Sequence, residues 1–427
     1  MDFDLLLEKK YAPYLILIFI ALIVYALIYA LGGEFGVGAH NWWNNYSRQT
    51  YSWLQGRLDI PYNRPYLEIA FFGDRMYMSF PPFPSIFLIP FVLIFGYNTP
   101  DHAIALGLAL VSNIYAYKIA LHFLKEKKAA MFFTLFLILG TNYLHISLWG
   151  SVWYMAQNMA FTLLLISIYY ALTDKNQHSV ISLLALCASM GCRPFNAIYL
   201  PVILYLIAKR ENLRFFETFV KKLVIYAIPA IMLGIFYMWL NYVRFGNIFE
   251  FGHNFLPEFT IDLQGQFHPS RIARNLRMML IGLDISYPIR NGFPHVDRTT
   301  FAIWLASPIF ISFIIYRVIY QKKFIYRIPS DILLTMTQVL VTMHILAFSL
   351  HRTLGGRQFG SRYVVDSLPI VFLGLMYMVG RILKENRDTV IISRHMLYNA
   401  VPFAFGTLIN FHGTIMFFAF YFPIYNH

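Results

Sequence analysis

The sequence predicts an all-α protein, a polytopic bundle of transmembrane helices, and three observations lead to this expectation. Hydrophobic residues make up 58% of the 427 residues and charged residues only 13%, about half the charged fraction of a soluble domain. Apolar runs long enough to cross a bilayer recur along the whole chain. The 41 Phe and 30 Tyr suit lipid-facing surfaces and the aromatic belts at membrane interfaces.

About 20 apolar residues are needed to cross the hydrocarbon core, and this length predicts about 11 spans, within a range of roughly 10–13. The first run follows Lys9 and Lys10. It is too long for a signal-peptide core and lacks a small-residue cleavage site, so we expect a retained anchor. The expected spans are 13–32, 102–123, 129–147, 152–172, 178–192, 195–208, 222–243, 300–320, 331–350, 364–383 and 396–416.

Lysine and arginine separate by side when these spans are laid out. Lysine-bearing loops alternate with loops of low charge, and the positive-inside rule makes the lysine-bearing loops cytoplasmic. All 13 lysines then lie on or near the cytoplasmic side, and the external cations are all arginine. Guanidinium is permanently charged and bidentate toward phosphate, so this pattern suits a phosphorylated ligand at the outer face. The alternative is that these arginines pair with external acids or reach lipid headgroups.

Three polar segments are expected outside the cytoplasm, namely 33–100, 244–299 and 351–363. The first is the largest, and we expect it to carry juxtamembrane helices. Its apolar stretch Ile86–Phe95 is short and follows three prolines, which favours a re-entrant or interfacial segment over a span. If it does cross, a compensating helix is needed elsewhere. No internal repeat or soluble appendage is visible, so residues 1–427 are predicted to form one domain.

Several function classes lack their motifs. The chain has no Walker loop, GxGxxG, HExxH or Cys/His metal spacing, which argues against nucleotide-driven transport and structural zinc. The net charge of +13 is explained by topology, so no nucleic-acid partner is expected. Cys187 and Cys192 belong to one apolar region and predict no disulfide framework.

Three carboxylates are candidate catalytic residues. Glu34 stands where the first span emerges, between Gly-Gly and Phe-Gly. Partial desolvation there would raise its pKa and suit it to act as a general base toward a hydroxyl; an ordinary boundary acid is the alternative. Glu68 and Asp74 flank the aromatic AFFGD turn, followed by Tyr77. They could orient an acceptor, bind a cation or pair with neighbouring arginines.

Arginines at the outer mouths of spans are candidate phosphate ligands. The stretch GGRQFGSRYVVDSLPIVF places Arg357 and Arg362 beside Tyr363 and Asp366. Charged residues entering a membrane helix usually face a cavity, so Arg362 is expected to bind phosphate or to pair with Asp366. Arg193, in CysArgPro, is placed similarly.

A second group of candidates lies in the external segment 244–299. Arg271, Arg274 and Arg277 recur with a spacing that puts them along one side of a helix. They form either a phosphate-binding stripe or a solvated face. His253 is a candidate for acceptor or sugar binding, as are Tyr77, Tyr363 and Asp366.

The ordered set of these motifs resembles the GT-C superfamily of integral-membrane glycosyltransferases, with architecture similar to protein O-mannosyltransferases and aminoarabinose transferases. One span is followed by a large loop ending in YMSFPPFPSIFLIPF, then CRPFNAIYLP, NYVRFGNIFEFGH and FGSRYVVDSLP. Together these segments cover most of the chain.

The resemblance implies a sugar donor on a polyprenyl phosphate, an acceptor hydroxyl outside the cytoplasm, and transfer with inversion. It also implies a catalytic carboxylate near the start of the first external loop, where Glu34 matches best. The Asp-Glu pair common in the characterised transferases is absent, so Glu68 and Asp74 remain candidates. Some family members need a divalent cation and others do not. Such an enzyme is expected in a bacterial plasma membrane, with its active site facing outside.

Two other function classes stay open. A transporter or flippase of lipid-linked saccharide would need a cavity that opens to both sides, and such proteins often have paired halves, which are not visible in this sequence. A non-catalytic assembly or receptor subunit would have an external cavity with no carboxylate near the bound lipid phosphate.

Overall fold

The computed structural model describes residues 7–32, 36–61, 68–173, 176–211, 216–260, 264–282, 302–323, 331–355, 358–385 and 389–421. Among them, seven helices are long and apolar enough to cross a membrane. These are α2 (Ala12–Gly32), α5 (Asp101–Leu124), α8 (Val152–Leu172), α11 (Phe216–Phe245), α16 (Ile332–Ser349), α17 (Leu368–Glu385) and α18 (Thr389–Tyr421). Four shorter helices pack among them: α6 (Lys127–Leu139), α9 (Asn176–Met190), α10 (Leu200–Arg210) and α15 (Ile309–Lys323). The chain is an integral membrane protein of the predicted all-α class.

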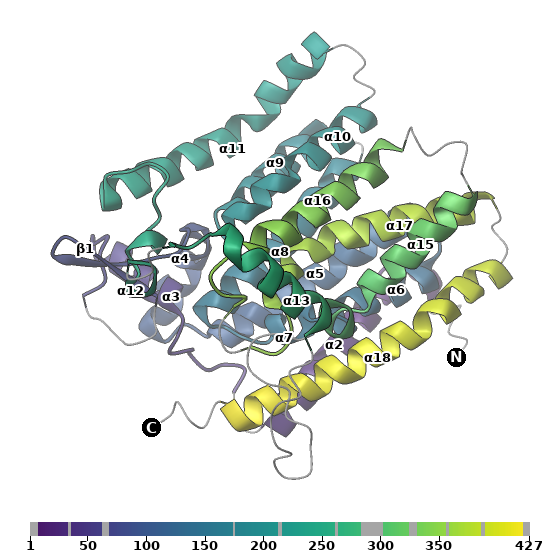
Figure 1. The fold of residues 1–427 in the computed structure, drawn as a ribbon, viewed down its shortest axis with the longest axis horizontal. Coiled ribbons are helices and arrows are strands. Elements are labelled where there is room, and N and C mark those ends of the chain that lie inside the picture. Colours follow the sequence, from purple (N-terminus) through teal and green to yellow (C-terminus); the bar gives the residue numbers. More distant parts are fainter. Residues whose placement is uncertain are drawn as a thin grey trace.

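The bundle has a buried centre and an apolar rim. In the span that includes α17, 94% of the residues are buried, against 6% in α11. Helix α8 packs against α5, α9, α10 and α17, whereas α11 runs along one edge beside α9 (Figure 1). The outward residues of α11, α2 and α18 are large and apolar. These helices therefore form the surface that suits contact with lipid tails.

Two expected spans are each divided in the structure. The stretch 129–147 forms α6 and a separate short helix, α7 (Tyr143–Ser147), with a break at Gly140. The stretch 300–320 contains α14 (Ile303–Ala306) and then α15, because Ser307 and Pro308 interrupt it. A hydropathy window cannot detect such breaks, since the residues on both sides are equally apolar.

The first polar segment folds against one end of the bundle. It contains α3 (Asn45–Leu54), a hairpin of β1 (Ile69–Phe72) and β2 (Arg75–Met78), α4 (Phe83–Phe95) and the 3-10 turn η1 (Gly96–Asn98). Gly73 has a φ of +59°, which glycine adopts readily in a two-residue hairpin turn.

Helix α4 contacts α3 near both of its ends. Near its start, Ser85 Oγ donates to the Tyr46 carbonyl at 3.2 Å, and just beyond its end the Tyr97 ring lies 6.2 Å from the Tyr51 ring. Helix α4 therefore lies beside α3, which fits the interfacial interpretation of Ile86–Phe95.

Further polar segments lie at the same end of the bundle. They are η2 (Pro194–Tyr199), η3 (His253–Phe255), α12 (Pro257–Thr260), η4 (Pro269–Arg271), α13 (Ile272–Ile281) and η6 (Arg362–Ser367). Among them, η3 contacts β1 and α12, and Figure 1 shows α12 at the end that carries α3, α4 and β1. We call this the arginine end, because Arg193, Arg244, Arg271 and Arg362 lie there. The opposite end, which carries Lys127, Lys209, Lys222 and Lys384, is the lysine end.

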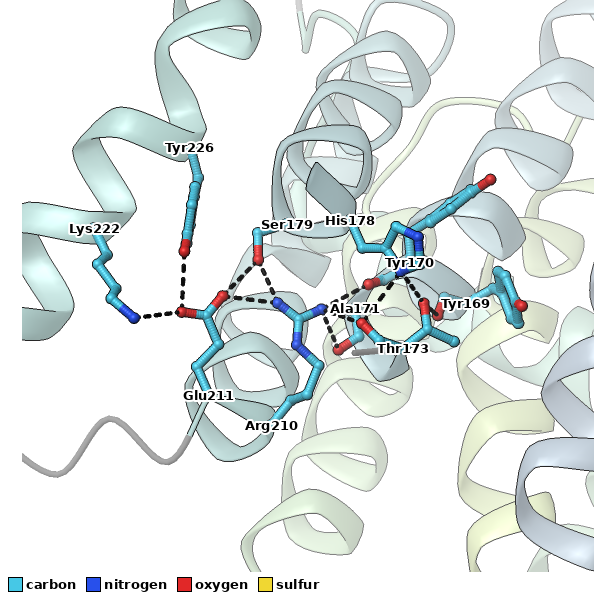
Figure 2. A network of polar contacts seen from close by, with 10 residues as sticks. All are labelled: Tyr169, Tyr170, Ala171, Thr173, His178, Ser179, Arg210, Glu211, Lys222 and Tyr226. Carbon is cyan, nitrogen blue, oxygen red and sulfur yellow. Dashed lines mark hydrogen bonds and ion pairs between the residues drawn. The ribbon is translucent and has the colours of Figure 1, made fainter. Parts of the chain in front are cut away.

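A polar network ties four helices together at the lysine end (Figure 2). Arg210 Nη1 donates to the Tyr170 and Thr173 carbonyls at 2.9 and 2.8 Å, so it satisfies carbonyl groups at the end of α8. Glu211 accepts from Arg210, Ser179, Lys222 and Tyr226. Every charge in this network has a partner, which indicates a structural role.

Candidate functional site

Arg193 and Arg362 come together at the arginine end from separate parts of the chain. Arg193 follows α9 in extended backbone, with φ −140°, just before η2. Its Nε donates to Asp366 Oδ2 at 2.9 Å, and the Asp366 carboxylate is fully buried. The Arg193 guanidinium also lies over the rings of Phe348 and Tyr363, at 5.8 and 5.2 Å. Arg193 is therefore a fixed cation whose charge is compensated within the protein.

Arg362, by contrast, has no compensating acid among the residues that the structure describes. Its side chain is 7% exposed, and its Nε is buried without any acceptor among the described residues. The guanidinium lies over the rings of Tyr154 and Tyr363, at 5.6 and 5.2 Å. Asp366 pairs with Arg193, so the alternative pair of Arg362 with Asp366 does not form. A buried cation without a counter-ion is costly unless an anionic ligand supplies one.

Gln157 on α8 holds η6, the turn that contains Arg362 and Asp366, in position. Its side-chain amide donates to the Arg362 carbonyl at 2.6 Å and to Asp366 Oδ1 at 2.7 Å. Both Asp366 oxygens are thereby occupied within the protein. Asp366, a candidate for acceptor or sugar binding, instead holds Arg193 and Gln157 in place.

Tyr363 is held from behind by a buried histidine. His344 Nε2 donates to the Tyr363 carbonyl at 2.9 Å, and the Tyr199 hydroxyl bonds His344 Nδ1 at 2.8 Å. The Tyr363 ring stacks on Phe348 with centroids 4.8 Å apart. This ring thus forms a rigid surface shared by both arginines.

Two neutral histidines lie beside these cations. Burial lowers the pKa of His351 to about 4, and the charges of Arg193, Arg362 and Arg271 act in the same direction. Burial likewise lowers the pKa of His253 to about 4, together with His351 and Arg193. Both imidazoles are therefore uncharged near neutral pH and can act only as neutral hydrogen-bonding groups.

The three arginines expected along one helix side differ in their surroundings. Arg271 belongs to η4 and donates through Nη1 to the Gly265 and Gln266 carbonyls, at 2.9 and 3.0 Å. Arg274 and Arg277 lie on α13 and are exposed. Asn275 anchors α13 to the carbonyls of Ser349 and His351 at 2.9 and 2.8 Å. The charge of Arg271 acts on His351.

Two of the three candidate carboxylates lie among the described residues. Glu34 lies outside the described residues, as does Arg357. Glu68 is half-buried and accepts from Trp153 Nε1 at 2.7 Å, at the start of α8. Asp74 is exposed at the hairpin turn.

Tyr77, a candidate for acceptor or sugar binding, is buried beneath the hairpin. It is 5% exposed and packs on Phe245, with ring centroids 5.2 Å apart. His253 lies nearer the arginines, and its Nδ1 is 3.4 Å from the Ser79 carbonyl.

Sequence analysis missed a buried acid at the start of α5. Asp101 is fully buried and lies 2.7 Å from His40 Nδ1; it also accepts from the Asn41 backbone at 3.0 Å and Ser47 Oγ at 3.1 Å. This network closes the first polar segment onto the bundle. The sequence shows only a single Asp after Thr-Pro at this position, which is typical of an ordinary helix start. Among the residues described, no group of three or more His, Cys, Asp or Glu side chains could hold a metal.

Comparisons with known proteins bear on the fold. No family model and no curated protein matches the sequence. Two crystal structures of ArnT, an aminoarabinose transferase from Cupriavidus metallidurans, do match in structure. The apo structure gives a TM-score of 0.50 at 13% identity and covers 95% of this chain and 76% of that chain. The structure bound to undecaprenyl phosphate gives 0.52 at 14% identity, covering 96% and 77%.

This chain has the fold of the GT-C membrane glycosyltransferases. On this GT-C fold, the arginines lie where the polar segments meet one end of the bundle. Arg362 is a buried cation that lacks an acidic partner among the described residues. Its neighbours Arg193 and Asp366 already satisfy each other.

Proposed function

We propose that the protein is a glycosyltransferase that moves a sugar from a polyprenyl-phosphate donor to an acceptor hydroxyl on the non-cytoplasmic face of the membrane. The observation that carries the proposal is that Arg362 is buried on a GT-C fold and has no counter-ion in the described part of the chain. A solved structure with this fold is bound to undecaprenyl phosphate. A lipid phosphate is an anion of the kind that Arg362 would require.

The proposed chemistry is a single displacement. The acceptor oxygen bonds to the anomeric carbon while the bond between that carbon and the phosphate oxygen breaks. The electron pair of the broken bond goes to the phosphate, whose added negative charge Arg362 stabilises. A carboxylate takes the acceptor proton, and the anomeric centre inverts.

Glu34 is the proposed base, and Glu68 and Asp74 are the alternatives. Of the two alternatives, Glu68 is supported by its bond to Trp153 of α8, which adjoins Tyr154 under the Arg362 guanidinium. Asp74 has less support, because it is exposed at the hairpin turn. Arg357 and Arg274 are proposed as further phosphate contacts at the mouth of the site.

The test is release of polyprenyl phosphate by purified protein in lipid nanodiscs. The donor is a polyprenyl-phosphate-linked sugar, and a cell-envelope extract supplies acceptors. Arg362→Gln should lower turnover about 100-fold or more, since one preorganised donor to developing charge has that effect. Glu34→Gln should abolish transfer and leave binding of polyprenyl phosphate intact.

Arg57→Gln is the matched control, because Arg57 is an exposed arginine paired with Asp59 at 2.7 Å. Its turnover should equal that of the wild type. Normal turnover by Arg362→Gln would contradict the phosphate assignment, and normal turnover by Glu34→Gln would contradict the choice of base. Transbilayer movement of the donor without release would favour a flippase.

A further inference from the structure

Helix α7 holds the segment that leads to Arg362. Asn142 Nδ2 donates to the Phe359 carbonyl at 3.1 Å, and the Phe359 N–H donates to His145 Nε2 at 3.4 Å. An imidazole nitrogen that accepts a hydrogen bond carries no proton, so in the neutral ring the proton is on Nδ1. His145 therefore presents an Nδ1–H group on the other side of its ring.

That N–H group has no partner. The His145 side chain is fully buried, and no described residue accepts from its Nδ1. Its surroundings are aromatic, with the rings of Phe417, Tyr154 and Phe359 at 4.9, 5.6 and 5.8 Å. A buried donor without an acceptor lowers stability unless a ligand or a water satisfies it.

His145 and Arg362 both contact the Tyr154 ring. The Arg362 guanidinium is 5.6 Å from the ring centroid, and its charge acts on the His145 imidazole. Arg362 Nε is also buried without an acceptor. Two buried donors without an acceptor among the described residues therefore lie near the same ring, and both Asp366 oxygens already accept from other groups. A ligand that satisfies both donors needs several acceptor oxygens and negative charge, which describes a phosphate.

We propose that His145 is a second phosphate-binding residue, whose Nδ1–H donates to the same lipid phosphate as Arg362. This inference rests on the proposed function. A neutral donor adds a hydrogen bond to the phosphate without placing a second uncompensated cation in the site. The bond strengthens as the phosphate gains charge during transfer.

Two substitutions of His145 distinguish binding of phosphate through Nδ1–H from holding the backbone of Phe359 through Nε2. In His145→Asn, the side-chain amide can stand in for Nδ1–H, while the acceptor for Phe359 is lost. In His145→Gln, the longer side chain can keep an acceptor for Phe359, while the donor at the Nδ1 position is lost. His145→Phe removes both.

Binding of undecaprenyl phosphate is measured for each variant in nanodiscs. Loss of a hydrogen bond to a charged group should weaken binding about 10- to 100-fold in His145→Gln and His145→Phe. His145→Asn should bind nearly as the wild type does. Because this probe carries no sugar, the loss would assign the contact to phosphate. His395→Ala is the control, since His395 is a buried histidine that hydrogen-bonds Tyr316 between α15 and α18 at 2.8 Å.

Wild-type affinity in His145→Gln combined with weak binding in His145→Asn would overturn the inference and make His145 a positioning residue. Wild-type affinity in all three variants would also overturn it. Either result would leave the proposed function intact, provided that turnover still depends on Arg362. If the wild-type protein itself neither binds undecaprenyl phosphate nor releases it from a donor, the proposed function fails as well.

Discussion

Asp366 shows how one residue decides the roles of its neighbours. Its two oxygens accept from Arg193 and Gln157, and neither bonds Arg362, four residues earlier in η6. Arg193 and Arg362 share the surface of the same Tyr363 ring. Of these two guanidinium groups, only Arg362 lacks an acidic partner among the described residues.

Removing the Asp366 charge should destabilise the fold. Asp366→Asn leaves Arg193 buried without a counter-ion, and we expect the free energy of unfolding to fall by about 3 kcal/mol. The double variant Arg193→Gln/Asp366→Asn should recover part of this loss, because it leaves no uncompensated charge. Denaturant unfolding in detergent measures both.

The control is Asp59→Asn, which breaks the more exposed pair with Arg57 and should cost less than about 1 kcal/mol. Equal losses in Asp366→Asn and Asp59→Asn would show that the buried pair has no special contribution.

At the scale of elements, glycines set how closely helices approach. On α18, a Cβ added at Gly406 would clash with the Gly140 carbonyl oxygen, just after α6. On α11, a Cβ added at Gly234 would meet no atom within 4 Å. The first glycine is required by packing, whereas the second lies in open space on the edge helix.

Alanine at these two positions should have opposite effects. Gly406→Ala should destabilise the protein by about 1–3 kcal/mol, because α18 must move away from α6. Gly234→Ala should leave stability unchanged or raise it by up to about 1 kcal/mol through helix propensity. Thermal unfolding in detergent compares the two, and similar midpoints would contradict the close approach of α18.

At the scale of the whole molecule, the two ends differ in their cations. The lysine end has a network of paired charges around Arg210 and Glu211 (Figure 2). The arginine end contains Arg362, which has no acidic partner among the described residues. The positive-inside rule predicts that the lysine end lies in the cytoplasm. The proposed site would then face the other side of the membrane.

Cysteine labelling in intact cells tests this orientation. A membrane-impermeant maleimide should label Asp74→Cys, at the exposed hairpin turn, before permeabilisation. Lys128→Cys, exposed at the start of α6, should react only afterwards. Cys187 and Cys192 are buried and free, so the parent protein should stay unlabelled. The reverse pattern would place the arginine end in the cytoplasm and contradict the proposed face.

The sequence by itself determined the helical membrane fold and predicted that the lysines gather at one end of the bundle. Hydropathy and charge depend on local composition, so apolar runs and the loops between them can be found without coordinates. The same is true of Arg193 and Arg362 as candidates, since each stands at the end of an apolar run.

Only the tertiary structure decided which of these residues pair. Arg193 and Asp366 are far apart in the chain, and their contact depends on how α9 and η6 pack against α8. For the same reason, sequence could not find His145, which looks like part of an apolar span until its unsatisfied N–H group is placed beside Tyr154 and Arg362. Side-chain pairing is a property of packing between distant segments, and no local pattern records it.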